Sequence, residues 1–413
     1  MQNTKQNIEQ IIKTAEQSLW EQFQNLEDIC LYNQKKVLDA FRDNRIAEEH
    51  FHTVSGYGHD DMGREAIDKT FAQIFKAERA IVRPHFVSGT HALACALFGN
   101  LRYGEKLISI AGRPYDTMEE VIGLRGNKRA SLAGHGVQYD EIPLIDGLHI
   151  DFDAIEKTVD KNTNMVLIQR SRGYSLRDPI TIEMMERIIQ IVKSKNPDCI
   201  CFVDNCYGEF TQAQEPIEIG ADLIAGSLIK NPGGGIVEAG GYILGKEEYV
   251  EQASIRLTAP GIAGDGGAML NQSRLILQGL FMSPSIVKDA IKGALLAAKV
   301  FEELGFKTSP KYTEPRSDII QTIEFGSAEP LEKFCRALQA SSPVDSYVTP
   351  IPDDVPGYDD KLIMAGGSFI EGSTIELSAD GPLRVPYVAY MQGGLNYAHV
   401  KIAIMNVLNE ILG

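Results

Sequence analysis

The stretch Ala221-Asp-Leu-Ile-Ala-Gly-Ser-Leu-Ile-Lys-Asn-Pro-Gly-Gly-Gly235 joins an apolar segment to a lysine and then to glycines. Its apolar part predicts a buried strand over about Leu223 to Ala225, and Lys230 follows the end of that strand, with Ser227 three positions before it. Lysines are mostly exposed, so Lys230 taken alone reads as a solvated surface charge. The end of a strand, next to polar residues and glycines, is also a position where a Schiff-base lysine is expected.

A second apolar stretch ends in an acid. The sequence Cys199-Ile-Cys-Phe-Val-Asp-Asn205 predicts a strand that is buried on both faces, with Asp204 at its carboxyl end. Burying a carboxylate is costly unless it meets a cation, and a protonated pyridine nitrogen is one such cation. A helix cap or a loop acid is the alternative interpretation of Asp204.

Upstream, a turn rich in small residues leads into a helical pattern. Ala80 to Pro84 predicts a strand, and Ser88-Gly-Thr-His-Ala-Leu-Ala-Cys-Ala-Leu97 predicts a turn followed by a helix. Free backbone N–H groups at a helix start bind phosphate, although Ser and Thr are also common in ordinary capped helices. Tyr115 follows the apolar segment Leu107 to Ile110, at a position where an aromatic ring could stack on a flat ligand.

Apolar and helical segments alternate through this half of the chain. Helices are predicted over about Thr117 to Leu124, Asp153 to Val159, Ile182 to Lys195 and Glu247 to Ile255, and further strands over Met165 to Gln169 and Gly241 to Leu244. This is the βαβ rhythm of an α/β fold with a mostly parallel sheet covered on both faces. Ligands of such sheets lie outside the carboxyl ends of the strands, where Asp204 and Lys230 are expected.

The two ends of the chain predict separate parts. The first fifty residues have apolar positions at helical spacing and predict a helical arm. A long helical pattern from Ile286 to Leu304 leads into Lys307 to Phe325 and a Pro- and Asp-rich loop, Pro350 to Tyr358, which indicates a smaller α+β domain. We therefore expect an arm over 1–55, a large domain over 56–282 and a small domain over 283–413.

Composition excludes several classes of function. The net charge of −16 over 413 residues argues against a nucleic-acid or anionic-membrane partner, because both require clustered Lys and Arg. No run of eighteen apolar residues predicts a membrane span, and Met1 to Trp20 lacks the apolar block of a signal peptide. A cytoplasmic protein is the expectation. Cys199, Cys201 and Cys206 lack companions that would complete a metal site, so they are expected to be buried, reduced thiols.

Two further motifs suggest ligands but fit them poorly. Gly240-Gly-Tyr-Ile-Leu-Gly-Lys246 begins like a phosphate-loop motif, yet Glu247 stands where Ser or Thr must bind magnesium. His59-Asp60-Asp61 contains three adjacent polar residues that regular structure cannot point at one ion, so a turn or the beginning of a helix is expected there. No Gly-x-Gly-x-x-Gly motif follows a strand, which leaves a dinucleotide-binding oxidoreductase without support.

Taken in order, the phosphate turn, the stacking aromatic, the ring-nitrogen acid and Ser-x-x-Lys resemble the pyridoxal-phosphate site of the aspartate-aminotransferase-like scaffold, fold type I. The chain is similar to the pyridoxal-phosphate-dependent lyases of cysteine and methionine metabolism, in the branch labelled aluminium-resistance or methionine gamma-lyase-like. The resemblance spans about Phe51 to Tyr397. It is carried by five segments: Gly56-Tyr-Gly-His-Asp-Asp-Met-Gly-Arg-Glu65, Gln169-Arg-Ser-Arg-Gly-Tyr174, Val203-Asp-Asn-Cys-Tyr-Gly-Glu209, Ser227 to Gly235 and Leu377-Ser-Ala-Asp-Gly-Pro-Leu-Arg384.

The resemblance assigns roles to residues of the large domain. Lys230 would hold pyridoxal 5'-phosphate as a Schiff base and then remove the substrate's α-proton, which requires a pKa lowered by desolvation and nearby positive charge. Asp204 would keep the pyridine nitrogen protonated, and Tyr115 would stack on the ring. The turn Ser88, Gly89 and Thr90, together with Ser227, would hold the phosphate.

Other positions depart from the family pattern. The Thr that usually precedes the lysine is Ile229 here, so this phosphate hydroxyl is either missing or supplied by Thr90 or by a residue of a second chain. Tyr57 matches a tyrosine that crosses the dimer interface to the neighbour's phosphate and leaving group, and Arg64 is a weaker candidate for the same role. The resemblance thus implies a homodimer or homotetramer with active sites at the dimer interface, on which the helical arm of a second subunit packs.

Two arginines are candidates for the substrate's α-carboxylate, which calls for a bidentate guanidinium. The lyases place this arginine just before the segment that begins at Leu377, where Glu376 stands in this chain. Arg384 is therefore the first candidate and Arg172 the second. Arg172 is also the residue chosen, among Gln169 to Arg172, to contact the cofactor's phenolic oxygen.

The function implied by the resemblance is carbon–sulfur lysis. A small sulfur amino acid, cystathionine, methionine or cysteine, would undergo β- or γ-elimination to a thiol, a 2-oxo acid and ammonia. The residues do not decide between these substrates, and no mechanism for aluminium tolerance is visible in them. An aminotransferase or a decarboxylase on the same scaffold, or a non-catalytic pyridoxal-phosphate-binding protein, remains an alternative.

Overall fold

A seven-stranded sheet forms the larger half of the molecule. The computed structural model describes residues 2–355 and 360–413. Strand β7 (Gly241–Gly245) runs antiparallel to both of its neighbours. Every other neighbouring pair in this sheet is parallel, which confirms the prediction of a mostly parallel sheet. In spatial order the strands are β1 (Arg79–Arg83), β7 (Gly241–Gly245), β6 (Leu223–Ser227), β5 (Ile200–Asp204), β4 (Thr163–Gln169), β2 (Lys106–Ser109) and β3 (Gln138–Glu141).

Helices cover both faces of this sheet. Successive strand residues alternate between the two cores: Cys201 and Val203 face one core, whereas Phe202 faces the other. This is the period of two that a strand imposes on its side chains. One face is covered by α4 (Gly89–Asn100), α5 (Asp116–Ile122) and α8 (Glu247–Leu257), and the other by α3 (Met62–Phe75), α6 (Phe152–Thr158) and α7 (Ile182–Lys195).

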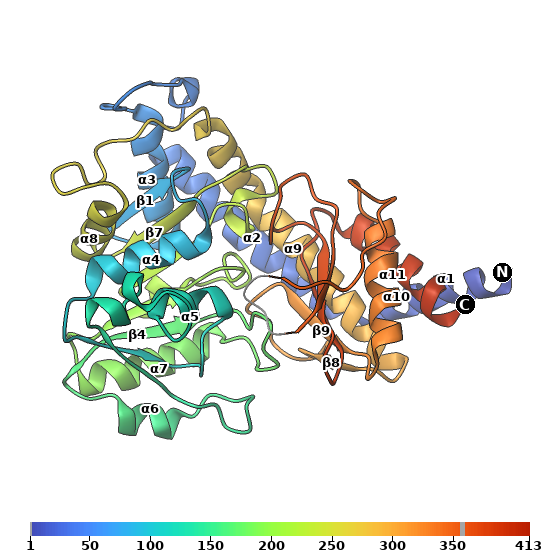
Figure 1. The fold of residues 1–413 in the computed structure, drawn as a ribbon. Coiled ribbons are helices and arrows are strands. Elements are labelled where there is room, and N and C mark those ends of the chain that lie inside the picture. The colour runs from blue at the N-terminus through green and yellow to red at the C-terminus, as the bar shows by residue number, and fades with distance from the viewer. Residues whose placement is uncertain (1, 356–359) are drawn as a thin grey trace.

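A smaller antiparallel sheet lies beside the large one (Figure 1). Its strands, in spatial order, are β10 (Leu362–Ala365), β11 (Ser378–Pro382), β12 (Val388–Gln392), β9 (Ile320–Glu324) and β8 (Lys307–Ser309). The helices α10 (Ala328–Ala340) and α11 (Tyr397–Leu412) accompany it. The predicted α/β architecture with a smaller α+β part is therefore confirmed.

The long helix α9 (Ser273–Glu303) extends from the large half of the molecule to the small half (Figure 1). The N-terminal arm packs along it as α1 (Gln2–Ser18) and α2 (Trp20–Asp43), so the predicted helical arm is found. Both termini lie at the same end of the molecule. Short 3-10 helices complete the secondary structure at Glu48–Phe51, Lys128–Ala130, Ala133–His135, Pro216–Ile219 and Asn231–Gly233.

Helix α9 begins earlier than the predicted Ile286. It starts at Ser273 and runs through Pro284, because the buried positions Ile276 and Leu280 continue the same apolar face. The predicted boundary at 282/283 falls inside this helix, so α9 belongs to both halves and the division into domains stays a prediction. Of the predicted loop over 350–358, residues 356–358 lie outside the described residues.

Several smaller predictions are confirmed. Gly241–Gly245 is a strand, and Asp61 caps α3 by accepting the Arg64 N–H at 3.0 Å. Cys199, Cys201 and Cys206 are buried and free. Within the two described ranges, no helix combines the length and the apolar character needed to cross a membrane.

Candidate active site

A cavity of about 410 Å³ opens at the carboxyl ends of β4, β5 and β6. The crevice outside the carboxyl ends of parallel strands is where α/β sheets bind their ligands. Seven of the predicted site residues line it together, namely Ser88, Gly89, Thr90, Tyr115, Asp204, Ser227 and Lys230. Residues from the small sheet close the opposite side, among them Asp380 and Tyr390.

Lys230 reaches this cavity from the loop after β6. Its Nζ lies 3.7 Å from the centroid of the Tyr207 ring. The Tyr207 backbone has φ +66°, a left-handed conformation that is uncommon for a bulky residue, and its hydroxyl donates to the Ser373 carbonyl at 3.1 Å. The loop after β5 thus holds an aromatic face against the amine.

The predicted lowering of the pKa of Lys230 is not found. Burial acts to lower this pKa, but Tyr207, Cys206 and Asp204 surround the amine and together raise it above its ordinary value. The expectation was wrong because it assumed nearby positive charge, whereas the neighbours that this chain supplies are acidic groups.

Asp204 is buried at the end of β5, with 5% of its surface exposed. Its Oδ1 accepts the Cys206 N–H at 3.1 Å, and the Cys206 thiol also hydrogen-bonds to the carboxylate. Burial raises the pKa of Asp204, against the opposing effect of Lys230 and these hydrogen bonds. The carboxylate is no helix cap, and it is placed to stabilise a cation in the cavity.

The start of α4 forms the predicted turn. Ser88 is both cap and cavity residue: its hydroxyl oxygen accepts the His91 N–H at 3.1 Å. Among the described residues, the N–H groups of Gly89 and Thr90, in the first turn of the helix, have no hydrogen-bond acceptor. A Cβ atom on Gly89 would lie 3.1 Å from the Ser227 Cβ and 3.4 Å from the Cys206 Sγ. Glycine therefore keeps this corner of the cavity open.

Tyr115 lies at the opposite rim of the turn, immediately before α5. Its hydroxyl hydrogen-bonds to the side chains of Thr90 and Thr117, whose own Oγ1 atoms are 3.2 Å apart. Burial raises the pKa of Tyr115 well above its ordinary value, so the phenol is neutral. These contacts fix the ring at the edge of the cavity.

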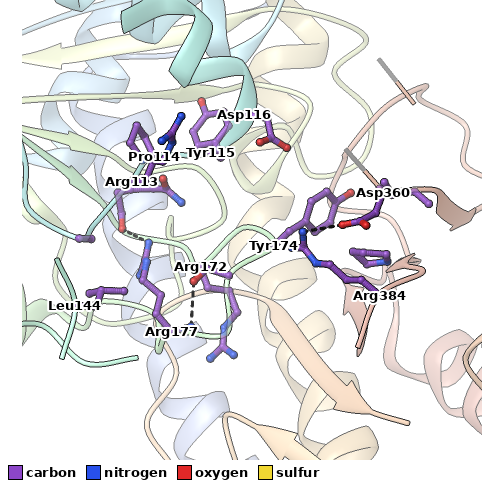
Figure 2. A pocket seen from close by; sticks show the side chains of 15 residues that line it. Arg113, Pro114, Tyr115, Asp116, Leu144, Arg172, Tyr174, Arg177, Asp360 and Arg384 are labelled. Carbon is purple, nitrogen blue, oxygen red and sulfur yellow. Dashed lines mark hydrogen bonds and ion pairs between the residues drawn. The ribbon is translucent and has the colours of Figure 1, made fainter. Parts of the chain in front are cut away.

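A second cavity of about 350 Å³ adjoins the first, since Tyr115, Gln169 and Tyr174 line both (Figure 2). Arg384 lines this second cavity and is paired with Asp360 at 3.0 Å beside Tyr174. The structure therefore does not place Arg384 in the Lys230 cavity. Among the described residues that line that cavity, Lys230 is the one cation, and Asp204 and Asp380 are the acids.

Three other candidates also lie apart from Lys230. The buried Arg172 guanidinium donates to the Ser309 Oγ and carbonyl at 3.0 and 3.2 Å, and Arg172 lines the second cavity, not the Lys230 cavity. Arg64 is buried and donates to the Gly58 carbonyl, in the loop that carries Tyr57. The Tyr57 side chain is 83% exposed and lies against His59, with ring centroids 5.7 Å apart.

The sequence did not single out the residues on the small-sheet side. Tyr174 donates to the Asp380 Oδ2 at 2.5 Å, and the Tyr390 hydroxyl donates to the Tyr174 carbonyl at 2.9 Å. Asp380 is 6% exposed, and burial raises its pKa to about 6. Both Tyr174 and Asp380 lie within segments that carry the family resemblance, which was the available signal.

A buried polar network supports the loop after β5. Arg170 contacts the Glu215 carboxylate at 3.3 Å and the Asn205 Oδ1 at 2.8 Å. Glu209 accepts the Tyr242 hydroxyl at 2.6 Å, and burial raises the pKa of Glu209 to about 8. This network fixes the backbone that presents Asp204 and Tyr207 to the cavity.

Comparison with known proteins agrees with this geometry. The chain is 45% identical to the uncharacterized protein YnbB of Bacillus subtilis, over 94% of this chain and 92% of that one. The structure of a candidate cystathionine beta-lyase involved in aluminium resistance from Listeria monocytogenes matches with a TM-score of 0.96 at 46% identity, covering 98% of this chain and 100% of that one.

A carbon–sulfur lyase involved in aluminium resistance from Clostridium novyi matches with a TM-score of 0.94 at 46% identity, over 99% of this chain and 97% of that one. The fold type I scaffold and the aluminium-resistance branch predicted from the sequence are thereby confirmed. Residues 8–412 match the methionine gamma-lyase family. The chain belongs to the methionine gamma-lyase family.

Proposed function

We propose that this chain is a pyridoxal-phosphate-dependent carbon–sulfur lyase that acts on a small sulfur amino acid. β- or γ-elimination from cystathionine, methionine or cysteine would give a thiol, a 2-oxo acid and ammonia. The observation that carries this proposal is the meeting of Lys230, Asp204 and the open turn at Gly89 in one cavity. Family membership supports the class of reaction.

The residues present fit the cofactor. A phosphate suits the free N–H groups of Gly89 and Thr90 and the buried Ser227 hydroxyl, where a Cβ on Gly89 would take up space. Asp204 suits a protonated ring nitrogen, because it is a buried carboxylate that lines the cavity and a cation there would offset the cost of its burial. When bound, pyridoxal phosphate supplies an electron sink for the negative charge that develops at the substrate's α-carbon.

The chain's own residues would then perform the proton chemistry. Lys230 would carry the cofactor and, once released by the incoming amino acid, take the α-proton on its Nζ. Asp204 would stabilise the positive charge on the ring nitrogen, and Tyr115 would cover the ring. Tyr207 would orient the lysine through the contact at 3.7 Å.

Two assignments from the family remain proposals with structural support. We propose that Arg384 binds a substrate carboxylate from the adjoining cavity, by exchanging its partner Asp360 for the ligand. We also propose a homodimer or homotetramer in which the exposed Tyr57 reaches the neighbouring subunit's cavity, because its own chain leaves the ring in solvent. The expected location is the cytoplasm.

The absorbance spectrum of the purified protein tests the proposal. Wild type reconstituted with pyridoxal phosphate should show the visible band of a Schiff base, and Lys230→Ala should lack it. Adding L-cystathionine, L-methionine and L-cysteine separately should release thiol and 2-oxo acid in equal amounts from at least one of them. A band without products from any substrate would contradict the lyase function, and a keto-acid-dependent reaction or released carbon dioxide would indicate transamination or decarboxylation instead.

A further inference from the structure

We propose that Asp380 is the acid that protonates the departing sulfur, and that Tyr174 is the residue that positions it. This inference rests on the proposed function, since it concerns the second half of the same elimination. Neither residue was assigned a role from the sequence.

Asp380 and Lys230 line the same cavity from opposite sheets. Asp380 lies on β11 of the small sheet and lines the same cavity as Lys230, which reaches it from the large sheet. Asp380 is close enough to Tyr207 to raise the pKa of that phenol, and the Tyr207 ring lies under the Lys230 amine. A substrate held at Lys230 would therefore have its distal atoms between the two sheets, on the side of Asp380.

The two oxygens of the Asp380 carboxyl group have different surroundings. The Tyr174 hydroxyl donates to Oδ2 at 2.5 Å, whereas within the described residues the other oxygen, Oδ1, accepts no hydrogen bond. Tyr390 fixes Tyr174 by donating to its carbonyl at 2.9 Å, and their rings meet edge to face with centroids 5.3 Å apart. One carboxyl oxygen is thus anchored and the other is available to carry a proton.

The environment of Asp380 favours its protonated form. Lys230 and Asp204 line the same cavity from the large sheet. Among the described residues, the titratable side chains that contact or interact with Asp380 are Tyr174 after β4, Tyr207 after β5, Tyr390 on β12 and Cys335 on α10. These are neutral acids, and burial therefore outweighs the hydrogen bond from Tyr174 and raises the pKa of Asp380 to about 6. A carboxyl group with such a pKa can hold a proton near neutral pH and release it during the reaction.

In a β-elimination, each bond that forms is matched by a bond that breaks. Lys230 takes the α-proton, and the electron pair of that C–H bond forms the new carbon–carbon double bond. The electron pair of the C–S bond passes to sulfur as that bond breaks. The Oδ1–H bond of Asp380 breaks and an S–H bond forms, which releases a neutral thiol. The carboxylate that remains is stabilised by the Tyr174 hydroxyl and regains its proton from water.

A pair of substrates that differ only in the leaving group tests this role. S-ethyl-L-cysteine expels a thiolate that requires a proton, whereas β-chloro-L-alanine expels chloride, which requires none. If wild type eliminates only at the γ-carbon, L-methionine and 2-amino-4-chlorobutanoate form the equivalent pair. In holoenzyme, Asp380→Asn should lower kcat on the thioether by about 10²- to 10⁴-fold, and by less than a tenth of that factor on the chloride.

Asp353→Asn provides the matched control. It makes the same chemical change at an exposed position that bridges to β10 and lines neither cavity. The control should retain wild-type activity on both substrates. Equal losses of Asp380→Asn on thioether and chloride would overturn the proposal, because they would indicate a structural role.

Three further outcomes are distinguishable. A loss confined to L-cystathionine, as a raised KM without loss on S-ethyl-L-cysteine, would mean that Asp380 binds the distal ammonium group, and would overturn the acid role. A wild type that eliminates chloride but releases no thiol from any thioether would overturn the proposed function itself. If wild type releases thiol but Asp380→Asn loses the same factor in kcat on the thioether and on the chloride, only the role of Asp380 is overturned.

The pH profile supplies a readout that a structural role would not move. For wild type, kcat/KM on the thioether should fall as pH rises through about 6, where Asp380 loses its proton, and the chloride profile should lack this limb. Tyr174→Phe removes a hydrogen bond that lowers the pKa of Asp380, so the limb should move to higher pH while kcat falls. A limb that stays in place in Tyr174→Phe would contradict the positioning role.

Discussion

The two walls of the Lys230 cavity are built in different ways. On the large-sheet wall, Asp204 ends β5 and Lys230 follows β6, and the apolar sequence before each residue predicts its strand. On the small-sheet wall, Asp380 is joined to Tyr174 by a hydrogen bond that spans 206 positions of sequence. We infer that the large-sheet wall binds the cofactor, whereas the small-sheet wall acts on the substrate. The variants below test that division.

Lys230→Ala should have the largest effect. Loss of the amine removes both the covalent attachment and the base, so kcat should fall by at least about 10³-fold and the visible band should disappear. Absorbance and product assays on the same preparation check this. Lys230→Arg is the matched control, since it keeps the charge over Tyr207 but cannot form a Schiff base, and it should be equally inactive. Activity in either variant would contradict the role of Lys230.

Asp204→Asn should follow, with a loss of about 10²-fold or more in kcat. The neutral amide cannot stabilise a protonated ring nitrogen, although it keeps the size of the side chain and can still accept the Cys206 N–H. The band should remain, because Lys230 is intact. If the rate falls by less than tenfold, Asp204 is a loop acid without a part in the chemistry.

Arg384→Ala should sharpen the contrast between the walls. We expect a KM about tenfold higher, with the band unchanged, because a lost charge-assisted contact is worth about 1.4 kcal/mol or more. Arg113→Ala is the control, since Arg113 lines the same cavity, is 56% exposed like Arg384, and is paired with Glu119. Equal effects of the two variants would show that neither guanidinium grips the substrate specifically.

Glu209 should give the smallest effect, on stability alone. Its pKa is raised from 4.5 in an unfolded chain to about 8 in the fold, so the folded state binds more protons between these values. Its contribution is complete below pH 4.5 and is lost as pH rises toward 8. Glu209→Gln should therefore reduce the fall in Tm between pH 5 and pH 8. An unchanged difference in Tm would mean that Glu209 titrates normally.

The large-sheet wall could be predicted because its geometry is local. The end of a buried strand can be read from the sequence, because the apolar run stops there. Parallel strands bring their carboxyl ends to one edge of the sheet, so Ser88, Asp204, Ser227 and Lys230 are expected to lie close together. The order of these segments also carried the family resemblance. What sequence reasoning could not give is the charge around Lys230, which depends on how Cys206 and Tyr207 turn back after β5.

The small-sheet wall escaped prediction for a physical reason. Strand register and the packing of the small sheet along α9 determine which residues of β11 and β12 face the cavity. Neither can be predicted from a local sequence pattern. The chemistry of a guanidinium favours Arg384 as the partner of the substrate carboxylate, yet Arg384 lines the adjoining cavity. The sequence around Arg172 favours a contact with the cofactor, but the Arg172 guanidinium is buried and donates to Ser309.

Chemical trapping identifies the lysine that carries the cofactor. The protein reconstituted with pyridoxal phosphate is reduced with borohydride, digested and mapped by mass spectrometry, which locates any lysine that forms a Schiff base with the aldehyde. We expect a single pyridoxyl adduct on the peptide that contains Lys230, and none in Lys230→Ala. An adduct on a different lysine, or no adduct in the wild type, would contradict this expectation.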